Sequence, residues 1–280
     1  MKAPTDQYCQ VGQVRTRYWV KGEHGSPIVL VHGIPGYVED WLPSIAALAA
    51  DHRIYALDLI GQGLTDKPAD ASYEIEEFAR FVRDFMSVQG IDHAHIVGHS
   101  LGGAAATRLT LLFPEAVGRL VLVASAGLGR EVHHLIPLSG APLIGSLLTR
   151  PSRSGSETFL KTLVHNPRVV TEESIDRDYL MTLQPGAHEA FLKTVRANTN
   201  VLSGQAKSMF GPNVDGLASI TSPVLILWGA RDPIVPLAHA LAAAERLRDA
   251  ELRVFEECGH VPMLEQTQAF NDAVSSFLKD

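Results

Sequence analysis

Short apolar runs rich in β-branched residues recur along the chain, and longer segments with a helical spacing of apolar residues separate them. The runs lie at residues 27–31, 53–57, 94–97, 119–123, 223–228 and 251–255. The helical segments between and after them lie at residues 41–50, 75–89, 101–113, 236–247 and 265–278. This alternation is typical of a parallel sheet with both faces covered. The sequence therefore predicts an α/β fold with a mostly parallel central sheet flanked by helices.

A further strand precedes this alternation of strands and helices, and one long segment interrupts it. Residues 13–20 alternate apolar and polar side chains, which predicts an antiparallel strand at an edge of the sheet. From about residue 129 to residue 216 the pattern gives way to an uncharged stretch at 135–149 and to short helical segments. The economical division is a core at 1–128, a helical cap or lid inserted at 129–216, and the rest of the core at 217–280.

Composition excludes several function classes. The formal charge is −7, and no long block of basic residues offers the electrostatic attraction that nucleic acid requires. The first ten residues lack the apolar segment of a signal peptide, and no apolar run reaches the roughly 18 residues of a membrane span. Cys9 and Cys258 have no metal-site spacing and favour a reducing compartment. We expect a cytoplasmic protein without a membrane span, nucleic-acid partner, metal or cofactor.

The segment G-H-S-L-G-G at residues 98–103 fits the pattern G-x-S-x-G and lies where a predicted strand meets a predicted helix. In this context the serine occupies a sharp turn, and small neighbours such as Gly98 and Gly102 let the backbone pass closely. The start of a helix also favours developing negative charge. We therefore interpret Ser100 as a nucleophile, with an ordinary tight turn as the alternative.

A serine hydroxyl requires a base and an acid that orients the base. Among twelve histidines, only His260 follows the last predicted strand, at the sheet edge where Ser100 is expected. Asp232 follows the strand at 223–228, and the order serine, acid, histidine is the one expected for this architecture. The alternatives are a loop histidine and an aspartate that begins a turn before proline. The sequence predicts a triad of Ser100, Asp232 and His260.

The tetrahedral intermediate also needs hydrogen-bond donors for its oxyanion. The segment H-G-I-P-G at residues 32–36 follows the strand at 27–31. We predict the backbone N–H groups of Ile34 and of Leu101, the residue after the nucleophile, as these donors. Pro35 has no N–H, and we expect His32 to brace the loop rather than to act as a base.

These pieces together resemble the α/β-hydrolase superfamily, in its serine-nucleophile, esterase-like subgroup with a helical cap after the sixth strand. The matching segments are residues 32–36, 58–63, 65–68, 98–103, 229–232 and 259–260. They span nearly the whole chain outside the expected insertion, so the resemblance implies the α/β-hydrolase fold. In this family Asp58 corresponds to a structural turn and has no catalytic role.

Within the superfamily, the identity of the nucleophilic residue distinguishes classes of enzymes that catalyse different reactions. Haloalkane dehalogenases and epoxide hydrolases place aspartate where this chain has Ser100, so the resemblance excludes both. Carbon–carbon bond hydrolases of aromatic ring-cleavage pathways are similar at residues 125–130 and 228–232. They usually carry asparagine in place of His99 and tryptophan in place of Val261. Arg177 or Arg196 could bind the carboxylate of their dienoate substrates, or could be solvated helix-face residues.

We expect a serine hydrolase that cleaves small or medium carboxylic esters through an acyl-enzyme at Ser100. The alternatives are a carbon–carbon bond hydrolase of aromatic meta-cleavage products and a ligand receptor on the same fold. A small-molecule ester is the only partner expected, and nothing in the sequence predicts an oligomeric state. Apolar residues of the insertion would line an acyl or aryl pocket or form its packing face; they lie at 135–149 and at Phe159, Leu163, Met209 and Phe210.

Overall fold

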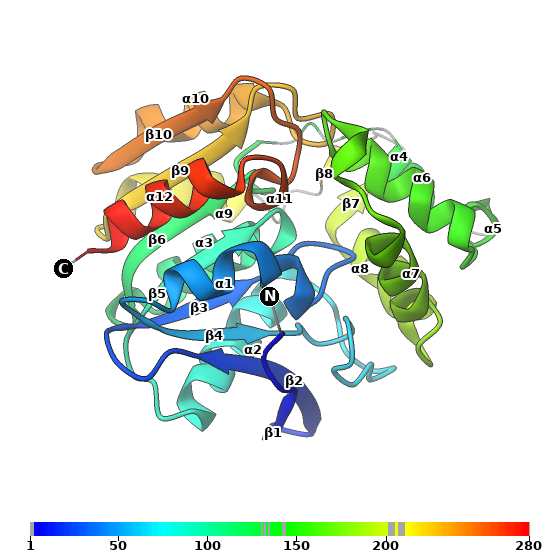
Figure 1. Ribbon diagram of the computed structural model, residues 1–280, viewed down its shortest axis with the longest axis horizontal. Helices are drawn as coiled ribbons and strands as arrows, with labels where there is room; N and C mark the ends of the chain where they lie inside the picture. The colour runs from blue at the N-terminus through cyan, green and yellow to red at the C-terminus, as the bar shows by residue number, and fades with distance from the viewer. Residues whose placement is uncertain are drawn as a thin grey trace.

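The computed structural model describes residues 3–129, 131, 133, 135–141, 144–200, 205–206 and 211–279. Its centre is an eight-stranded sheet with the strand order β1-β2-β4-β3-β5-β6-β9-β10, seen in Figure 1. Within this eight-stranded sheet, only the pairs β1–β2 and β2–β4 are antiparallel, so the prediction of a mostly parallel sheet is confirmed. The strands are β1 (Gln7–Val11), β2 (Val14–Lys21), β3 (Pro27–Val31), β4 (Arg53–Leu57), β5 (Ala94–His99), β6 (Val117–Val123), β9 (Val224–Gly229) and β10 (Ala250–Phe255).

The antiparallel strand expected at residues 13–20 is β2, but β2 is not the edge of the sheet. β1 pairs along its outer side, with Gln7 opposite Tyr18 and Val11 opposite Val14. Most side chains of β1 are exposed, and only Val11 is buried. An edge strand that buries so little carries no clear apolar alternation, which explains why the sequence did not reveal it.

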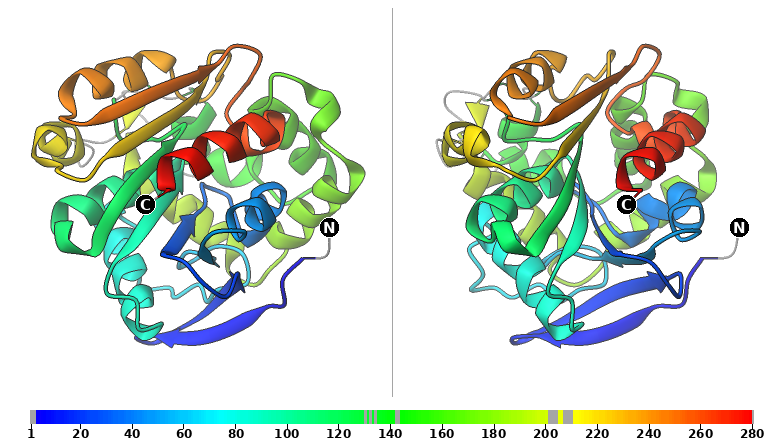
Figure 2. Two further views of the ribbon diagram at one scale, coloured as in Figure 1. Left: turned by 60° about the vertical axis from the view of Figure 1, so that its left-hand side comes forward. Right: turned by 90° about the vertical axis from the view of Figure 1, so that its left-hand side faces the viewer.

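Helices cover both faces of the sheet, as the two views of Figure 2 show. Ile28 and Leu30 of β3 pack in one buried cluster with α1 (Leu42–Leu48) and α12 (Thr267–Leu278). Val29 and Val31, the alternate residues, pack in the other cluster. The helices of that second face are α2 (Ile75–Val88), α3 (Leu101–Leu112) and α10 (Leu237–Arg246). Each fully buried side chain of this kind stabilises the fold by about 1.5–3 kcal/mol.

Between β6 and β9 the chain forms a helical insertion. Its helices α4 to α8 lie together beyond one end of the sheet, at the right of Figure 1. Ser152 and Thr171 cap α6 and α7 by accepting hydrogen bonds from backbone N–H groups, which fixes where these helices begin. The helices are α4 (Leu135–Ser139), α5 (Ile144–Leu148), α6 (Arg153–Leu163), α7 (Glu172–Thr182) and α8 (Ala187–Asn198).

The last part of the expected insertion lies elsewhere. A short hairpin of β7 (Thr199–Asn200) and β8 (Gln205–Ala206) follows α8, and then comes α9 (Gly211–Gly216). α9 packs against α3 of the core, where Nδ2 of Asn213 donates a hydrogen bond to the carbonyl of Ala104 over 3.0 Å. The remaining elements are the 3₁₀ turns η1 (Val38–Trp41), η2 (Pro114–Ala116), η3 (Pro167–Val169) and η5 (Leu217–Ser219), and α11 (Pro262–Glu265).

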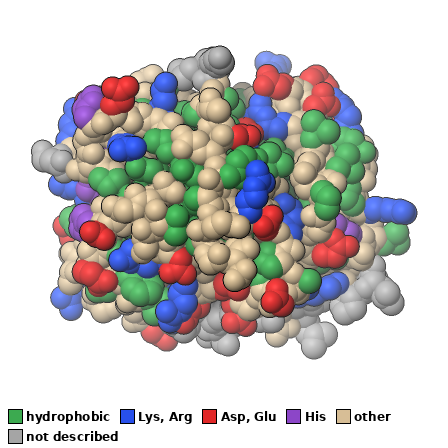
Figure 3. All heavy atoms as spheres, turned by 90° about the horizontal axis from the view of Figure 1, so that it is seen from below, with side chains coloured by type: hydrophobic (Ala, Val, Ile, Leu, Met, Phe, Trp, Pro, Cys, Tyr) green, Lys and Arg blue, Asp and Glu red, His purple; other side chains and the backbone are tan. Residues whose placement is uncertain are grey.

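The surface agrees with the dispersed charge of the sequence. On the face drawn in Figure 3, acidic and basic side chains are interspersed with hydrophobic ones. Among the helices of the described segments, none combines the length and the apolar character needed to cross a membrane.

Candidate active site

Ser100 occupies the turn between β5 and α3. Its backbone has φ of 52° and ψ of −117°, a conformation that non-glycine residues rarely adopt. A Cβ atom at Gly98 would lie 2.5 Å from the carbonyl oxygen of Gly102, and one at Gly102 would lie 2.3 Å from that of Val31. Both positions therefore need glycine, which explains physically why the pattern G-x-S-x-G has glycine on either side of the serine.

The three residues predicted as a triad are brought together from three separate loops. Nε2 of His260 lies 3.0 Å from Oγ of Ser100, and Nδ1 of His260 lies 2.8 Å from Oδ2 of Asp232. Hydrogen-bond donation from Nδ1–H to the carboxylate leaves the lone pair of Nε2 facing the serine hydroxyl. The side chains of His260 and Asp232 are buried, whereas Ser100 retains 8% of its surface.

Backbone groups fix the orientation of the acid. Oδ1 of Asp232 accepts hydrogen bonds from the N–H groups of Ile234 at 2.8 Å and Val235 at 3.0 Å. With one carboxylate oxygen held in this way, the other points at His260. The turn after β9 thus orients the carboxylate toward the imidazole.

The backbone of His260 is held from two sides. Nε2 of His99 donates a hydrogen bond to the carbonyl oxygen of His260 over 2.8 Å, and the N–H of His260 donates to the carbonyl of Leu163 over 2.7 Å. Burial, and next the neighbouring His260, lower the pKa of His99 to about 3, so its ring is neutral. Sequence reasoning assigned no role to His99, and its position beside the nucleophile in the strand-to-helix turn was the available signal.

The expected oxyanion loop lies against Ser100. A Cβ atom at Gly33 would lie 3.0 Å from Cβ of Ser100, so the backbone that leads into Ile34 touches the nucleophile turn. Leu101 is the first residue of α3, where N–H groups have no partner within the helix. The two predicted donors thus belong to the segments that flank the serine.

His32 braces this loop, as the sequence predicted. Its Nδ1 donates a hydrogen bond to the carbonyl of Gly33 over 2.8 Å, and its Nε2 accepts one from the N–H of Leu59 over 3.0 Å. Burial lowers the pKa of His32 to about 4, so the ring is neutral and connects two loops by its hydrogen bonds.

A buried cluster of charged side chains lies next to the segment that follows the expected oxyanion loop at residues 32–36. Arg17 contacts Oε1 of Glu39 at 2.6 Å and Oδ2 of Asp58 at 3.4 Å. Asp58 also accepts hydrogen bonds from the N–H groups of Val38 at 2.7 Å and Leu64 at 2.8 Å. Burial raises the pKa of Asp58 to about 7, against the lowering effect of Arg17. Asp58 holds the turn together, which agrees with the structural role expected for it.

The two arginines considered for binding a substrate carboxylate, Arg177 and Arg196, both have partners within the insertion. Nε of Arg196 donates to the carbonyl of Gly140 over 2.9 Å. Arg177 forms an ion pair of 2.7 Å with Glu173 on the same helix. Among the expected pocket residues, Leu163 packs against the core cluster and Phe159 is half-buried. Met209, Phe210 and Arg130 lie outside the described residues.

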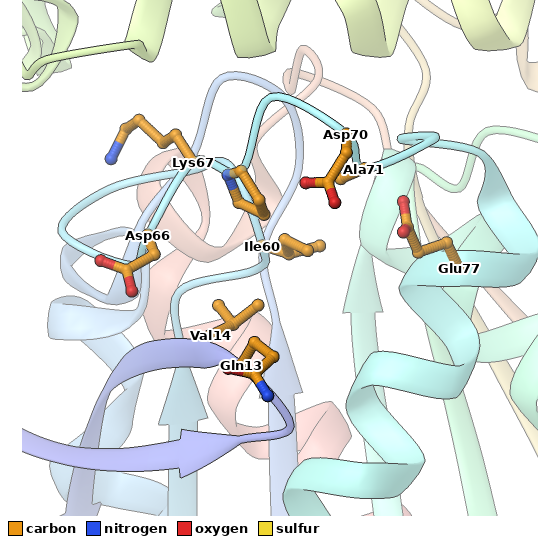
Figure 4. A pocket seen from close by; sticks show the side chains of 9 residues that line it. Gln13, Val14, Ile60, Asp66, Lys67, Asp70, Ala71 and Glu77 are labelled. Atoms are coloured by element: carbon orange, nitrogen blue, oxygen red, sulfur yellow. The ribbon is translucent and has the colours of Figure 1, made fainter.

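A hollow of about 530 Å³ opens elsewhere, beside the loop after β4 and the start of α2 (Figure 4). Two of its carboxylates are already engaged by backbone, since Glu77 accepts from the N–H of Tyr73 and Asp66 from that of Arg15. None of Ser100, Asp232 and His260 lines this hollow, so the hollow is separate from the candidate active site. Its lining residues are Gln13, Val14, Ile60, Asp66, Lys67, Pro68, Asp70, Ala71 and Glu77.

Residues 26–267 match the sequence model of the alpha/beta hydrolase fold. The chain belongs to the alpha/beta hydrolase family. It is 31% identical to the dihydrolipoyllysine-residue acetyltransferase component of an acetoin cleaving system from Pseudomonas putida, over 99% of this chain and 70% of that protein. It is 33% identical to the 2-hydroxy-6-oxononadienedioate/2-hydroxy-6-oxononatrienedioate hydrolase of Comamonas testosteroni, over 91% of this chain and 88% of that protein.

A solved structure of a meta-cleavage product hydrolase from Pseudomonas fluorescens IP01 is similar to this alpha/beta hydrolase with a TM-score of 0.82. The two are 28% identical, and the match covers 97% of this chain and 96% of that one. The superfamily and the fold expected from the sequence are thereby confirmed.

Proposed function

We propose that this alpha/beta hydrolase uses Ser100 as a nucleophile, His260 as its general base and Asp232 as the group that orients the base. The observation that carries the proposal is the continuous chain of hydrogen bonds from Ser100 through His260 to Asp232, at 3.0 and 2.8 Å. Both distances lie within the reach required for proton transfer.

In the first half of the cycle, Oγ of Ser100 attacks a carbonyl carbon while Nε2 of His260 takes the serine proton. The backbone N–H groups of Ile34 and Leu101 stabilise the oxyanion. The bond to the leaving group breaks, His260 returns the proton to that group, and an acyl-enzyme remains. In the second half, water gives a proton to His260 and attacks the acyl carbon. The bond from that carbon to Oγ of Ser100 breaks, His260 returns the proton to Oγ, and a carboxylic acid is released.

For the substrate, we propose a 2-hydroxy-6-oxo-dienoate whose carbon–carbon bond beside the 6-oxo group is cleaved. This proposal is supported by the similarity to the Comamonas and Pseudomonas fluorescens hydrolases over more than nine-tenths of the chain. A carbon leaving group needs somewhere to place its electron pair. In the keto tautomer of such a dienoate, the conjugated 2-oxo group accepts that electron pair. The serine mechanism described above can therefore cleave this carbon–carbon bond.

Ester hydrolysis is the second candidate, and it was the first expectation from the sequence. Two residues favour it: His99 and Val261 stand where ring-cleavage hydrolases usually have asparagine and tryptophan. Nε2 of His99 donates a hydrogen bond to the backbone carbonyl of His260, and the neutral ring brings no charge to the site. An ester requires only the triad and the oxyanion donors, because its alcohol leaves without an electron sink.

We propose that the insertion at 129–216 acts as a cap over Ser100, between core segments at 1–128 and 217–280. The proposal is supported by the hydrogen bond from the N–H of His260 to the carbonyl of Leu163, at the end of α6. Because α9 packs on α3, the covering part of this insertion would be α4 to α8.

One experiment tests both substrate classes. Turnover of 2-hydroxy-6-oxononadienedioate is measured beside a series of 4-nitrophenyl esters of increasing acyl length, with wild-type protein and Ser100→Ala. We expect the dienoate to be turned over with the higher kcat/KM and the variant to be inactive on every substrate. Faster turnover of one ester would assign ester hydrolysis instead. Stoichiometric binding without turnover would indicate a receptor, and full activity of Ser100→Ala would overturn the catalytic assignment.

A further inference from the structure

The loop that carries His260 (residues 257–262) touches the segment at residues 163–166, where α6 of the insertion ends. The N–H of His260 donates to the carbonyl of Leu163 over 2.7 Å. A Cβ atom at Gly259 would lie 2.6 Å from that carbonyl oxygen and 2.7 Å from the backbone nitrogen of His165. The two backbones therefore approach so closely that only glycine fits between them.

One carboxylate spans this contact. Oε1 of Glu265 accepts a hydrogen bond from the N–H of Gly259 over 2.7 Å. Oε2 of the same residue accepts from the N–H groups of His165 at 2.7 Å and Asn166 at 3.1 Å. Hydrogen bonds to an ionised acceptor are about twice as strong as those between neutral groups. Glu265 lies in α11, directly after the histidine loop, and thus ties that loop to a segment about 100 residues away in the chain.

We propose that Glu265 is a positioning residue that clamps the His260 loop to the insertion, so that the position of the insertion sets the geometry of the base. The proposal rests on the proposed serine hydrolase function. Within the described part of the chain, Glu265 forms no hydrogen bond with Ser100 or Asp232, and it acts on His260 through Gly259 and through the 163–166 segment.

The clamp matters because the imidazole has to meet two partners at once. Nε2 of His260 faces Ser100 at 3.0 Å, while Nδ1 faces Asp232 at 2.8 Å. Misplacement by about 1 Å is enough to cost roughly a hundredfold in rate. A shift of residues 163–166 would withdraw the acceptor of the His260 N–H and two donors of Glu265 together. The insertion and the base would consequently move as one unit.

A neighbouring pair provides a matched control. Nε2 of His165 lies 2.9 Å from Oε2 of Glu257, joining the same two segments through side chains. Glu257 is 72% exposed, and surface pairs of this kind contribute little to stability or position. Replacing Glu257 by glutamine removes a carboxylate beside the same loop and leaves the hydrogen bonds of Glu265 in place.

The test compares wild-type protein, Glu265→Gln, Glu257→Gln and Ser100→Ala in two measurements. The first is labelling of Ser100 by a fluorophosphonate, in which the serine oxygen bonds to phosphorus, fluoride leaves and His260 takes the proton. The second is amide hydrogen exchange of residues 163–166 and 257–260, which needs no substrate. Where Glu265→Gln does not fold, Glu265→Asp, which retains the charge but is one methylene shorter, takes its place.

We expect Glu265→Gln to lower the maximal labelling rate by about tenfold to a hundredfold with an unchanged half-saturating probe concentration. Exchange of both segments should rise together, while Glu257→Gln matches the wild type in both measurements. A Glu265→Gln protein with wild-type labelling, or with faster exchange in only one segment, would overturn the clamp. Absence of labelling in the wild type, or labelling that survives in Ser100→Ala, would instead count against the serine hydrolase function, and exchange would still decide whether the segments are tied.

Discussion

Nε2 of His99 lies 2.8 Å from the backbone oxygen of His260, although the two residues are 161 positions apart in the chain. The residue before the proposed nucleophile thus holds the backbone of the residue proposed as its general base. Because burial and the neighbouring His260 lower the pKa of His99 to about 3, the ring is neutral at pH 7. Its proton is therefore on Nε2, where it serves the carbonyl.

Replacement of His99 by leucine removes this donor and leaves a buried carbonyl without its partner, which costs about 1–3 kcal/mol of unfolding free energy at pH 7. We expect an accompanying drop of about tenfold in the rate at which a fluorophosphonate labels Ser100. Urea unfolding and labelling kinetics measure the two effects. Labelling at the wild-type rate would show that the His99 contact does not position the base.

The same variant has a defined pH dependence. The folded pKa of His99, about 3, lies below its ordinary value of 6.5, so the unfolded chain binds the proton first as pH falls. Stability from neutral His99 is therefore present above pH 6.5 and is lost as pH falls toward 3. The stability advantage of wild type over His99→Leu should shrink by about 2 kcal/mol between pH 7 and pH 5, at about 1.36 kcal/mol per pH unit. Urea titrations at both pH values check this, and an advantage that does not change would contradict it.

Asp232→Asn tests the orientation of the base. The variant retains an oxygen for the N–H groups of Ile234 and Val235, so we expect it to fold. It loses the negative charge that holds Nδ1–H of His260, and the equivalent change in a serine protease lowers kcat about 10⁴-fold. The measurement is turnover of the best substrate beside thermal unfolding. A loss below about tenfold with an intact fold would remove Asp232 from the triad.

The strand and helix ranges of the core followed from periodicity, because buried parallel strands are continuously apolar and the helices between them have one apolar face. The proposed triad of Ser100, Asp232 and His260 could be predicted because each residue lies in the turn or loop that follows a strand, and parallel strands end at one sheet edge. β1 was missed since its side chains are mostly exposed. The sequence did not reveal the contacts of His99 and Glu265, since both side chains bind backbone atoms of distant segments, which side-chain patterns do not report.

Arg17→Met tests the charged cluster beneath the oxyanion loop. The guanidinium is 3% exposed and faces Glu39 and Asp58, whose side chains are 12% and 0% exposed. Removing one member of a buried ion pair costs about 3–5 kcal/mol because the remaining charge has no partner. We expect a loss of that size in urea unfolding at pH 8. Arg80→Met is the control, because its ion pair with Glu76 is exposed and should cost less than about 1 kcal/mol. Equal losses in both variants would contradict the assignment.

Asp178 of α7 tests the electrostatics between the insertion and the core, because its negative charge adds to the effect of burial in raising the pKa values of Tyr37 and Asp40, which follow the predicted oxyanion loop. Asp178 is 4% exposed, and burial raises its pKa to about 6 while a hydrogen bond with Ser156 opposes the rise. The folded pKa lies above the ordinary value of 3.8, so the folded protein binds the proton more tightly between these values. Stability is fully present below pH 3.8 and is lost as pH rises through 6.

Asp178→Asn removes this titration. We expect the variant to gain stability relative to wild type as pH rises from 4 to 7, by about 3 kcal/mol at most. This bound follows because each pKa unit between the folded and the ordinary value corresponds to about 1.36 kcal/mol. Asp176→Asn is the matched control on the same helix, because Asp176 is 59% exposed and pairs with Arg153 at the surface. Unfolding free energies at pH 4, 5.5 and 7 decide the matter. A difference between Asp178→Asn and wild type that stays constant over this range would mean that Asp178 is already charged in the fold at pH 4, and that burial does not raise its pKa.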